Sequence, residues 1–426
     1  MENKHIKILV AHPGRQHSYR VATALIHHDM LDKYATTVYD KKSSILMKIT
    51  KAFIKGDERN RANRRRCPDV DDSYVIQFNE FTGLIELLIG RLDHTKKIAL
   101  WFRHKVVSDT FQKKLARYII KNDVKAVISY DTNSTILFSI LKKKAPDVIR
   151  IIDNAHPCRN YLYEVYNEKL ESSKQFAKTY EACGYLTDKE FAGMFGDEAK
   201  LADYHIVAST FSKQASLFNG IPEDKILLVP YGVSRSAFKP LNKVYDKGLK
   251  VLFVGEVNQR KGICQILDAA KSLHDYDIEF NIIGAGREYC SELYTPYEKY
   301  VNFRGRVPFE DLQMYYGTSH IFVFPSMGEG YGLVLPEALA SGLPVIASQN
   351  CAGPDLIKNG YNGFIIDAGE TQQLVDKILW FYNNMEQLPQ MQENAIESVS
   401  DLTWEKYEET LIQQLEKKIF NKKSAE

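Results

Sequence analysis

The sequence has few cysteines, and those it has stand alone. Six occur in 426 residues, at positions 67, 158, 183, 264, 290 and 351, and no two have the spacing of a metal-ligand pair. Six isolated cysteines in a chain of this length do not form a disulfide scaffold either. The pattern therefore argues against a cysteine-based metal site and a disulfide-rich protein, and it favours a reducing, cytosolic compartment.

Long hydrophobic runs are also missing. No apolar stretch reaches the 18 residues or so that a membrane span needs, and the opening residues MENKHIKILVAHPG are too short an apolar stretch for a signal peptide. The net charge is only +2, with 44% apolar and 26% charged residues. These values indicate an ordinary globular protein, and the length predicts two domains.

Two widespread motifs fail at decisive positions. A dinucleotide dehydrogenase needs G-x-G-x-x-G, but GAGREY places Tyr289 where the third glycine belongs. A metal-dependent transferase needs Asp-x-Asp after a strand. The two matches begin at Asp69, in a charged loop, and at Asp275, which precedes a predicted strand. We therefore expect neither a metal site nor a bound cofactor.

Short apolar runs alternate with helical patterns along most of the chain. Each run has four to seven residues and is apolar on both faces, which is typical of strands buried in a parallel sheet. The runs are IKILVA, VKAVISY, VIRIID, YHIVAS, KILLVP, KVLFVG, IEFNIIG, HIFVFP, PVIAS and GFIID. About ten strands alternating with helices predict a doubly wound α/β architecture in two domains, divided within residues 230–248, where Pro, Gly and Lys are concentrated.

Two carboxylates flank a glycine-rich loop after one of these strands. Glu329 and Glu337 stand eight positions apart in FVFPSMGEGYGLVLPEALASGLPVIAS, and every second residue from 328 to 332 is glycine. Ligands of open α/β sheets bind beyond the carboxyl ends of the strands, and a helix N-terminus there favours phosphate. Carboxylates accept hydrogen bonds from vicinal hydroxyls. Two carboxylates on either side of a phosphate-binding loop thus suit a nucleotide sugar. The alternatives without a function are that Glu337 stabilises the start of a helix and that Glu329 is a solvated loop residue.

The same stretch resembles the E-x7-E signature of retaining glycosyltransferases of family 4, which have the GT-B architecture. The likeness continues in ADYHIVASTFSKQASLFNGIPEDKILLVPYGVSRSAFKP, VLFVGEVNQRKGICQILDAA, NIIGAG, FRGRVPFEDLQMYYGTSHIFVFPS and TWEKYEETL. It covers residues 200–415 well. The resemblance implies two Rossmann-like, doubly wound domains facing a cleft: an acceptor-binding domain over 1–235 and a nucleotide-sugar-binding domain over 236–402. A C-terminal helix over 403–426 would then pack back on the first domain.

The resemblance also assigns residues. Glu329 would bind donor-sugar hydroxyls, Glu337 the ribose, and Arg260 with Lys261 the diphosphate. The implied catalytic residues are His156, Glu329, Lys261 and Arg260. The implied donor-binding residues are Gly14, Gly255, Arg260, Lys261, Gly284, Val307, Glu329, Gly330, Tyr331, Gly332, Leu333, Val334 and Glu337. One departure concerns Glu256, where many members have arginine, and Arg260 would supply that cation.

The first domain matches its expected pattern less closely. Only Gly14 stands in the turn after the first strand, with His12, Arg15 and His17 around it. His156 follows the strand run VIRIID and matches the family's histidine at the donor sugar, although a lone loop histidine is more often a solvated residue. Further candidates are Asp153, Arg159 and the SYDT run at 129–132.

A basic segment is the other informative feature. Residues 41–66 contain ten basic and two acidic residues. As a helix, SSILMKITKAFIKG places Ile45, Ile49, Ala52 and Phe53 on one face, with Lys48, Lys51 and Lys55 on another. Such a helix is typical of binding to an anionic membrane surface. The alternative is a helix packed in the core beside a solvated loop. Nucleic-acid binding is not expected, because no recognition module is visible.

The sequence therefore predicts a retaining hexosyltransferase of the family 4 type that needs no metal and uses a nucleotide diphosphate sugar, with UDP-sugars favoured over GDP-sugars. The acceptor would be a hydroxyl of a saccharide or of a lipid-linked molecule, in the synthesis of surface polysaccharide or glycolipid. The expected location is the cytoplasm, with peripheral membrane attachment through residues 41–66. The alternatives are an epimerase or a phosphorylase of the same architecture, or a non-catalytic nucleotide-sugar-binding protein.

Overall fold

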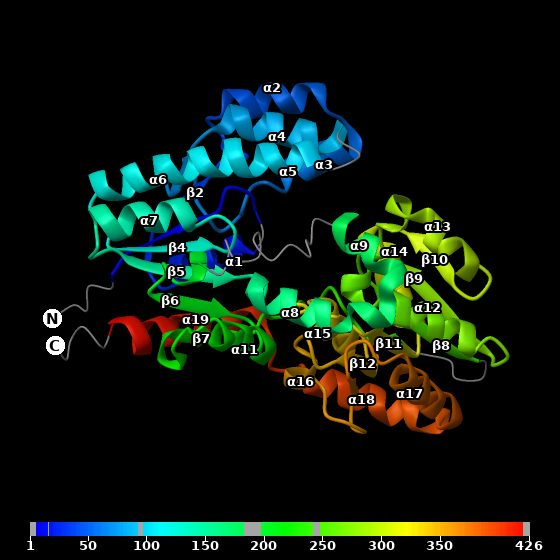
Figure 1. Ribbon diagram of the computed structural model, residues 1–426. Coiled ribbons are helices and arrows are strands. Elements are labelled where there is room, and N and C mark those ends of the chain that lie inside the picture. The colour runs from blue at the N-terminus through cyan, green and yellow to red at the C-terminus, as the bar shows by residue number, and fades with distance from the viewer. Residues whose placement is uncertain (1–5, 16, 93–96, 183–196, 242–247, 421–426) are drawn as a thin grey trace.

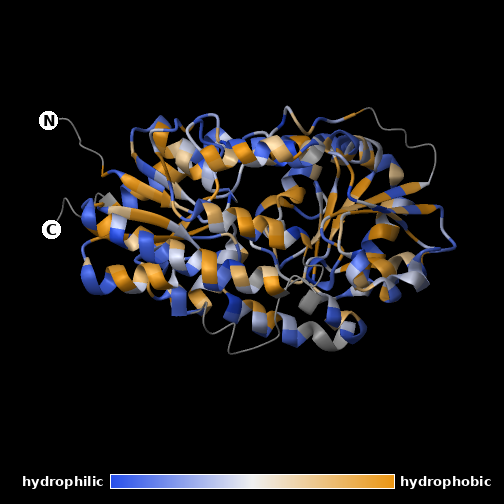
Figure 2. Cartoon of the chain, turned by 90° about the horizontal axis from the view of Figure 1, so that it is seen from above, coloured by the Kyte–Doolittle hydropathy of each residue, from blue (hydrophilic) through white to orange (hydrophobic). Residues whose placement is uncertain are grey.

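Two parallel β-sheets, one in each half of the chain, organise the protein (Figure 1). The computed structural model describes residues 6–15, 17–92, 97–182, 197–241 and 248–420. Figure 2 shows why the sheets form where they do: the strands are mostly hydrophobic, while the helices around them are hydrophobic on one side and hydrophilic on the other. Strands that are apolar on both faces are stable only when helices cover both faces of the sheet.

The first sheet has seven strands in the order β3-β2-β1-β4-β5-β6-β7, all parallel. Its strands are β1 Ile8–Ala11, β2 Leu31–Thr36, β3 Val75–Gln77, β4 Ala126–Tyr130, β5 Ile149–Asn154, β6 Tyr204–Val207 and β7 Ile226–Leu228. The central strands β1, β4 and β5 are buried along their whole length. The order reverses between β1 and β4, and such a switch point is where open α/β sheets bind ligands.

The second sheet has six parallel strands in the order β10-β9-β8-β11-β12-β13. Its strands are β8 Leu249–Val254, β9 Ile278–Ile283, β10 Asn302–Gly305, β11 Ile321–Phe324, β12 Val345–Ser348 and β13 Gly363–Ile366. Its switch point lies between β8 and β11. The two-domain, doubly wound α/β architecture predicted from the sequence is therefore confirmed.

Helices cover both sheets. Among the described residues, the helices of the first half include α1 Ser18–His27, α2 Ile45–Phe53, α3 Gly56–Asn63, α4 Glu80–Leu92, α5 Lys97–Phe102, the π-helix η1 Arg103–Ser108, α6 Asp109–Lys121, α7 Thr135–Lys144, α8 Arg159–Leu170, the 3₁₀ helix η2 Glu171–Phe176, α9 Ala177–Ala182 and α11 Thr210–Phe218. Those of the second half are the 3₁₀ turn η4 Gln259–Lys261, α12 Ile263–Ser272, α13 Ser291–Tyr294, α14 Phe309–Thr318, α15 Val334–Ala340, α16 Gly353–Leu356, α17 Thr371–Asn383 and α18 Leu388–Ser398, followed by α19 Trp404–Leu415 and the π-helix η8 Glu416–Phe420.

The chain connects the two halves twice, near residues 233 and 402, and the two connecting segments contact each other. After α18 it returns to the first half, where α19 packs against α1 and β7 (Figure 1). Thr403 caps α19 by accepting a hydrogen bond from the Lys406 amide at 3.2 Å. The Val233 amide donates to the Leu402 carbonyl at 2.9 Å, which joins the outgoing and returning segments. We propose the domain boundaries after residues 235 and 402, beside this contact.

Three strands and two helix starts differ from the sequence prediction. The apolar runs missed β2, β3 and β10. β3 and β10 are short, half-exposed edge strands, and β2 carries the half-buried pair Asp32 and Lys33. The helical pattern of residues 261–274 predicts a helix from Lys261, but α12 begins at Ile263, because Lys261 belongs to the 3₁₀ turn before it. Pro336 suits a first helical turn and predicts a helix over PEALAS, but α15 begins two residues earlier, at Val334, so Pro336 is its third residue.

The alternative of a core-packed helix within residues 41–66 is wrong. α2 forms with Ser44 as its N-cap, but Met47 is its only buried residue. The apolar face predicted from the sequence points to solvent: Ile45 is 71% exposed, Ile49 51% and Phe53 84%. In Figure 1, α2 lies on the outside of the first domain, next to α4. Within the described residues, no helix is both long and apolar enough to cross a bilayer.

Candidate functional site

A tight turn after β8 positions two cations at the carboxyl edge of the second sheet. Asn258 accepts a hydrogen bond from the Lys261 amide at 3.3 Å, which fixes the turn that carries Arg260 and Lys261. Gly262 ends the turn with φ +74°, and a Cβ there would lie 2.0 Å from the Pro325 carbonyl oxygen. Only glycine fits this close approach, so α12 starts directly against the end of β11.

Both cations meet one carboxylate oxygen. Arg260 Nη1 and Lys261 Nζ form ion pairs with Oε2 of Glu329, on the loop after β11. The three side chains are only 9%, 12% and 15% exposed. Burial by itself would raise the pKa of Glu329, but the charges of Arg260 and Lys261 outweigh it and hold this pKa well below its usual range. Glu329 therefore stays ionised at any physiological pH.

The loop that carries Glu329 is anchored to the same turn. The Arg260 carbonyl accepts hydrogen bonds from the Met327 amide at 2.9 Å and from the Ser326 hydroxyl at 3.0 Å. On the other side, the Glu329 amide donates to the Asn350 carbonyl at 2.9 Å. The cations and the carboxylate are thus fixed by backbone contacts from both sides.

The first domain presses directly against this loop. Gly330 lies so close to the segment after β5 that an added Cβ would lie 2.2 Å from the Ala155 carbonyl oxygen. The Gly330 carbonyl accepts hydrogen bonds from Ser209 at 2.5 Å and Ser212 at 2.8 Å, at the start of α11. The carboxyl edges of the two sheets therefore face each other across the Glu329 loop.

The same contact places His156 of the first domain beside the loop. Its Cα lies 3.3 Å from the Cβ position of Gly330, and its charge lowers the pKa of Glu329 further. His156 Nδ1 lies 3.0 Å from Oδ2 of Asp131, which follows β4. Asp131 also accepts a hydrogen bond from the Ala155 amide at 3.1 Å. A carboxylate on Nδ1 fixes both the tautomer and the orientation of the ring.

A second histidine–aspartate pair lies at the neighbouring strand ends. His17 Nε2 lies 2.8 Å from Oδ2 of the buried Asp153, and His12 accepts the Gly14 amide at 2.8 Å. Burial lowers the pKa of His12 to about 4, so its ring is neutral. Burial would also lower the pKa of His17, but the charge of Asp153 and its hydrogen bond raise it overall.

The further candidates, Arg159 and the SYDT run at 129–132, have different roles in the same region. Burial by itself would raise the pKa of Asp131, but His156 and, to a smaller extent, the charge of Arg159 at the start of α8 lower it overall. Ser129 is buried and accepts a hydrogen bond from Ser134 at 2.8 Å, which is a structural contact. The Thr132 amide donates to the buried Glu198 at 2.7 Å. Of the SYDT run, Asp131 is therefore the residue that contacts the segment packed against the Glu329 loop.

The other predicted donor residues line the same edge of the second sheet or the helix above it. The Gly255 amide donates to the Ile283 carbonyl, and the Gly284 amide to the Gly305 carbonyl, each at 2.9 Å. Val307 follows β10 and is partly buried. Tyr331 points away from the edge, because its hydroxyl donates to the Tyr231 carbonyl at 3.0 Å. Only its backbone is therefore available to a ligand, whereas the neighbouring Gly332, Leu333 and Val334 lead into α15.

Glu337 lies in the first turn of α15, apart from the ion-paired group. Burial raises its pKa to about 7, although a hydrogen bond of 3.2 Å from the Tyr316 hydroxyl opposes the shift. The pKa values of the two glutamates are thus shifted in opposite directions: Glu329 stays ionised, whereas Glu337 titrates near pH 7.

Sequence reasoning missed the residues that hold the site together. The sequence singles out Asp131 only as one of the four residues of the SYDT run. Ser209 and Ser212 lie in a stretch that resembles the family, but the resemblance assigns them no role. A signal for Asp131 exists: it follows a buried strand next to the strand that precedes His156, so the two must share one sheet edge. Among the described residues, no group of three or more histidine, cysteine, aspartate or glutamate side chains is placed to hold a metal ion.

Comparisons with known proteins agree with the fold. Residues 234–398 match the model of the family described as "Glycosyl transferases group 1". Solved structures similar over nearly the whole chain include sucrose-phosphate synthase from Thermosynechococcus elongatus, with a TM-score of 0.67, 18% identity and coverage of 98% of this chain and 100% of that one. A protein of Anabaena, HepE, solved in complex with UDP-glucose, has a TM-score of 0.61, 14% identity and coverage of 97% and 100%. The fold is GT-B.

Similar proteins of known sequence align with only part of the chain. An uncharacterized glycosyltransferase of Methanocaldococcus jannaschii is 32% identical over 163 residues, 36% of this chain and 44% of that protein. The amylovoran biosynthesis glycosyltransferase AmsK of Erwinia amylovora is 29% identical over 174 residues, 38% of this chain and 42% of that protein. The chain thus spans less than half of the length of each of these two relatives.

Proposed function

We propose that this protein is a retaining glycosyltransferase of the family 4 type, which transfers a hexose from a nucleotide diphosphate sugar to a hydroxyl of an acceptor without a metal ion. The observation that carries the proposal is the convergence of Arg260 and Lys261 on Glu329, directly beside His156 of the other domain. The match of residues 234–398 to a glycosyltransferase model supports it.

The two cations suit a diphosphate leaving group. In the transfer step, the acceptor oxygen bonds to the anomeric carbon as the bond from that carbon to the diphosphate oxygen breaks. The nucleoside diphosphate leaves with the bonding electron pair, and the hydroxyl proton passes to it. Negative charge grows on the diphosphate, so buried, fixed cations stabilise the transition state more than the ground state. Arg260 and Lys261 would supply that charge, while Glu329 accepts hydrogen bonds from the sugar hydroxyls.

His156 would contact the donor sugar from the first domain, with Asp131 as its positioning residue. The backbone of His156 lies against Gly330, and its charge acts on Glu329, the carboxylate that would hold the sugar hydroxyls. The Gly14 turn lies in the same cluster of strand ends, because the charge of Asp131 acts on His12 as well. Gly14, Gly255, Gly284 and Val307 would complete the donor site through their backbone or apolar contacts.

Glu337 would bind the ribose of the donor, and UDP is the nucleotide that we favour over GDP. A carboxylate can accept hydrogen bonds from both ribose hydroxyls, whereas a protonated carboxyl group is a poorer partner. The fold shared with an Anabaena protein solved in complex with UDP-glucose supports the choice of nucleotide.

This role makes donor affinity depend on pH. Because the pKa of Glu337 is about 7, the carboxylate form is the minor form at pH 6 and the major form at pH 8. If only that form accepts the ribose hydroxyls, the affinity for UDP-glucose should rise about tenfold from pH 6 to pH 8. Calorimetric titration of wild type and Glu337→Gln over this range checks it. An equal pH dependence in both proteins would remove Glu337 from the ribose site.

A panel of nucleotide sugars tests the proposed function. Thermal denaturation with UDP-, GDP-, ADP- and dTDP-sugars should show an increase in apparent stability for one nucleotide class, with UDP-sugars giving the largest shift, since a ligand that binds the native state raises its stability by mass action. Inorganic pyrophosphate and free glucose serve as controls for each part of the donor. If no nucleotide sugar raises the melting temperature more than pyrophosphate does, the proposal fails.

The acceptor belongs, in our proposal, to surface polysaccharide or glycolipid synthesis. Two similar proteins point there by their names: the amylovoran biosynthesis glycosyltransferase AmsK and the lipopolysaccharide outer core galactosyltransferase WaaB, which shares the fold with a TM-score of 0.62 and 17% identity. Acceptors of this kind are built on or near membranes.

We also propose that α2 and the basic residues around it dock the protein on an anionic membrane. The exposed face of α2 supplies apolar side chains, and basic residues near such a surface contribute about 1 kcal/mol each. Three cations of the segment are engaged within the described part of the protein: Lys51 pairs with Asp40, Arg66 pairs with Asp72 at 2.9 Å, and Lys41 Nζ donates to the Val75 carbonyl at 2.9 Å. The remaining basic residues carry the attraction.

Removing the apolar face should release the protein from vesicles. Ile45→Ser/Phe53→Ser should weaken co-sedimentation with phosphatidylglycerol vesicles by about tenfold or more, since each buried apolar side chain contributes about 1.5–3 kcal/mol. The matched control is Leu217→Ser/Phe218→Ser, an exposed apolar pair on α11. Wild-type protein that stays in the supernatant at low salt, or equal loss in both variants, would contradict the docking proposal.

A further inference from the structure

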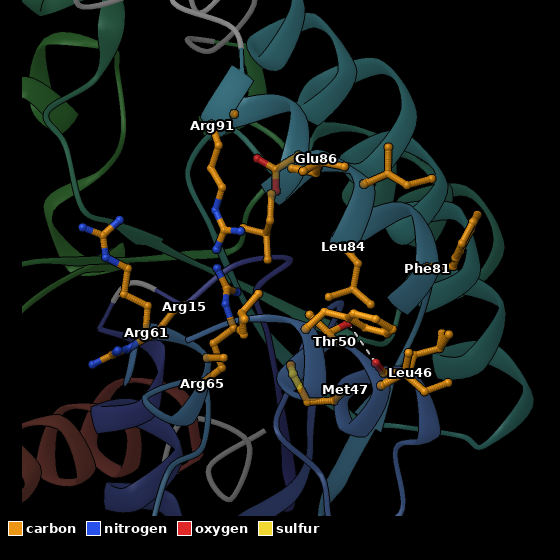
Figure 3. Close-up of a pocket in the computed structure, with 18 of the residues that line it drawn as sticks. Arg15, Leu46, Met47, Thr50, Arg61, Arg65, Phe81, Leu84, Glu86 and Arg91 are labelled. Carbon is orange, nitrogen blue, oxygen red and sulfur yellow. Dashed lines mark hydrogen bonds between the residues drawn. The ribbon is translucent and has the colours of Figure 1, made fainter. Parts of the chain in front are cut away.

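A pocket in the first domain lies outside the donor site described above. It is a half-open pocket lined by α2, the end of α3, α4, the start of η1 and the loop between β1 and α1, and its volume is about 730 Å³. A pocket of this size accommodates a substantial small-molecule ligand. Figure 3 shows that its lining is divided: arginine side chains gather at one end, and apolar side chains of α2 and α4 line the other.

The cationic end carries a charge that the protein leaves largely unbalanced. Six arginines and a single acidic residue, Glu86, line the pocket; the arginines are residues 15, 61, 64, 65, 91 and 103. Glu86 pairs with Arg103 at 2.6 Å. Arg15, Arg61, Arg64 and Arg65 have no ion pair within the part of the chain that the structure describes. Repeated like charges of this kind are stabilised by a bound anion.

The electrostatic repulsion among these arginines shows most directly at Arg65. Burial lowers the pKa of its guanidinium, and the nearby charges of Arg15 and Arg91 lower it further, while Tyr19 and Glu86 oppose the shift. A phosphate group between these side chains would replace repulsion by attraction. Arginine is the side chain that binds phosphate through two hydrogen bonds at once.

The apolar end continues into an exposed hydrophobic surface. Phe53 of α2 is 84% exposed, and Phe81 and Leu88 of α4 are 62% and 53% exposed. Ile98 and Trp101 are exposed on α5, which contacts α4. Exposed apolar side chains that gather around a pocket favour the binding of an apolar molecule. A free phosphate or polyphosphate would leave it uncovered, whereas the hydrocarbon chain of a lipid would cover it.

The pocket also borders the reaction site. Arg15 stands in the loop that contains Gly14 and His17, and His17 binds Asp153 at the carboxyl edge of the first sheet. On the other side, the charge of Arg103 acts on His12 of the same loop. An anionic group held by these arginines would thus place whatever it carries at the edge that faces the Glu329 loop.

We propose that this pocket binds the acceptor, and that the acceptor is a lipid whose phosphate or diphosphate lies among the arginines while its hydrocarbon chain lies along α2 and α4. The inference rests on the proposed function, because it assigns the second substrate of the same transfer. A saccharide carried on the phosphate would extend toward His17 and His156 and present the hydroxyl that receives the sugar.

Calorimetry with monomeric decyl phosphate, below its micelle concentration, tests the pocket without a membrane. Decyl phosphate should bind about tenfold or more tightly than either inorganic pyrophosphate, which has only the charge, or decyl maltoside, which has only the chain. Arg61→Glu/Arg64→Glu should weaken binding about tenfold or more, and so should Phe81→Ser/Leu88→Ser at the other end. The four substituted side chains are all exposed, so both variants should fold.

The matched control is Lys113→Glu/Arg117→Glu on α6, which makes the same change in net charge at exposed positions outside the pocket. It should bind decyl phosphate as wild type does, and all variants should keep wild-type affinity for UDP. If UDP binds but decyl phosphate does not, or if pyrophosphate or decyl maltoside binds equally well, the pocket inference is wrong while the donor proposal stands. If UDP does not bind to the wild type, the failure lies in the proposed function.

Discussion

Glu329→Ala and Lys261→Ala should each reduce the rate of nucleoside diphosphate release by about 100-fold or more, because the first removes the carboxylate that would hold the sugar hydroxyls and the second removes a cation that would stabilise the leaving diphosphate. The reason lies in their shared contact: both residues are almost buried, and Lys261 and Arg260 meet the same carboxylate oxygen. Truncating one partner also leaves the other charges buried without their balance. Initial rates at saturating donor measure the effect.

The surface ion pair between Lys406 and Glu409 provides the control. It joins the same residue types at 3.1 Å, but both side chains are more than half exposed. Lys406→Ala and Glu409→Ala should leave the rate within about twofold of wild type, because exposed pairs contribute little. Near-normal rates in Glu329→Ala and Lys261→Ala, with the fold intact by circular dichroism, would show that the diphosphate binds elsewhere.

His156→Ala should slow sugar transfer by about 100-fold while changing the dissociation constant of UDP far less, because the ring would contact the sugar and not the nucleotide. Asp131→Asn should produce a smaller loss of the same kind, since it keeps the ring but disturbs the hydrogen bond of 3.0 Å that orients it. Transfer rates and UDP titrations of the same preparations separate the two quantities.

A second histidine beside an aspartate offers the comparison. His274 lies 3.3 Å from Asp275 on the surface of the second domain, and its side chain is about half exposed. His274→Ala should leave both the rate and the UDP affinity unchanged. A loss of UDP affinity as large as the loss of rate in His156→Ala would instead indicate that this histidine supports the fold of the site and does not contact the sugar.

The second domain could be predicted from the sequence more fully than the first. Its strands are continuous apolar runs, and the residues of the Glu329 loop and the Lys261 turn are close to a known motif. The ion pairs among Arg260, Lys261 and Glu329 were not predicted, because they depend on how two loops from non-adjacent segments pack at the end of β8 and β11. Spacing along a chain gives residue types at a sheet edge but not their partners.

The first domain shows where local patterns fail. β3 has three residues and only Val75 is fully buried, so it has no hydrophobic run to detect. The amphipathic face of α2 was visible in the sequence, but whether it faced the core or solvent was not, since both use the same period. The pocket beside it depends on α4, whose role in lining it with α2 follows only from the tertiary structure.

The measurement that tests the central claim most directly is an NMR time course of a nucleotide sugar incubated with the enzyme and a detergent extract of bacterial membranes. We predict that the donor gives nucleoside diphosphate and an equal amount of transferred sugar with its anomeric configuration retained, and that Glu329→Ala gives neither. A new nucleotide sugar would indicate an epimerase, and a sugar 1-phosphate formed with added phosphate would indicate a phosphorylase. Either product, or an unchanged donor in the wild type, would contradict the proposal.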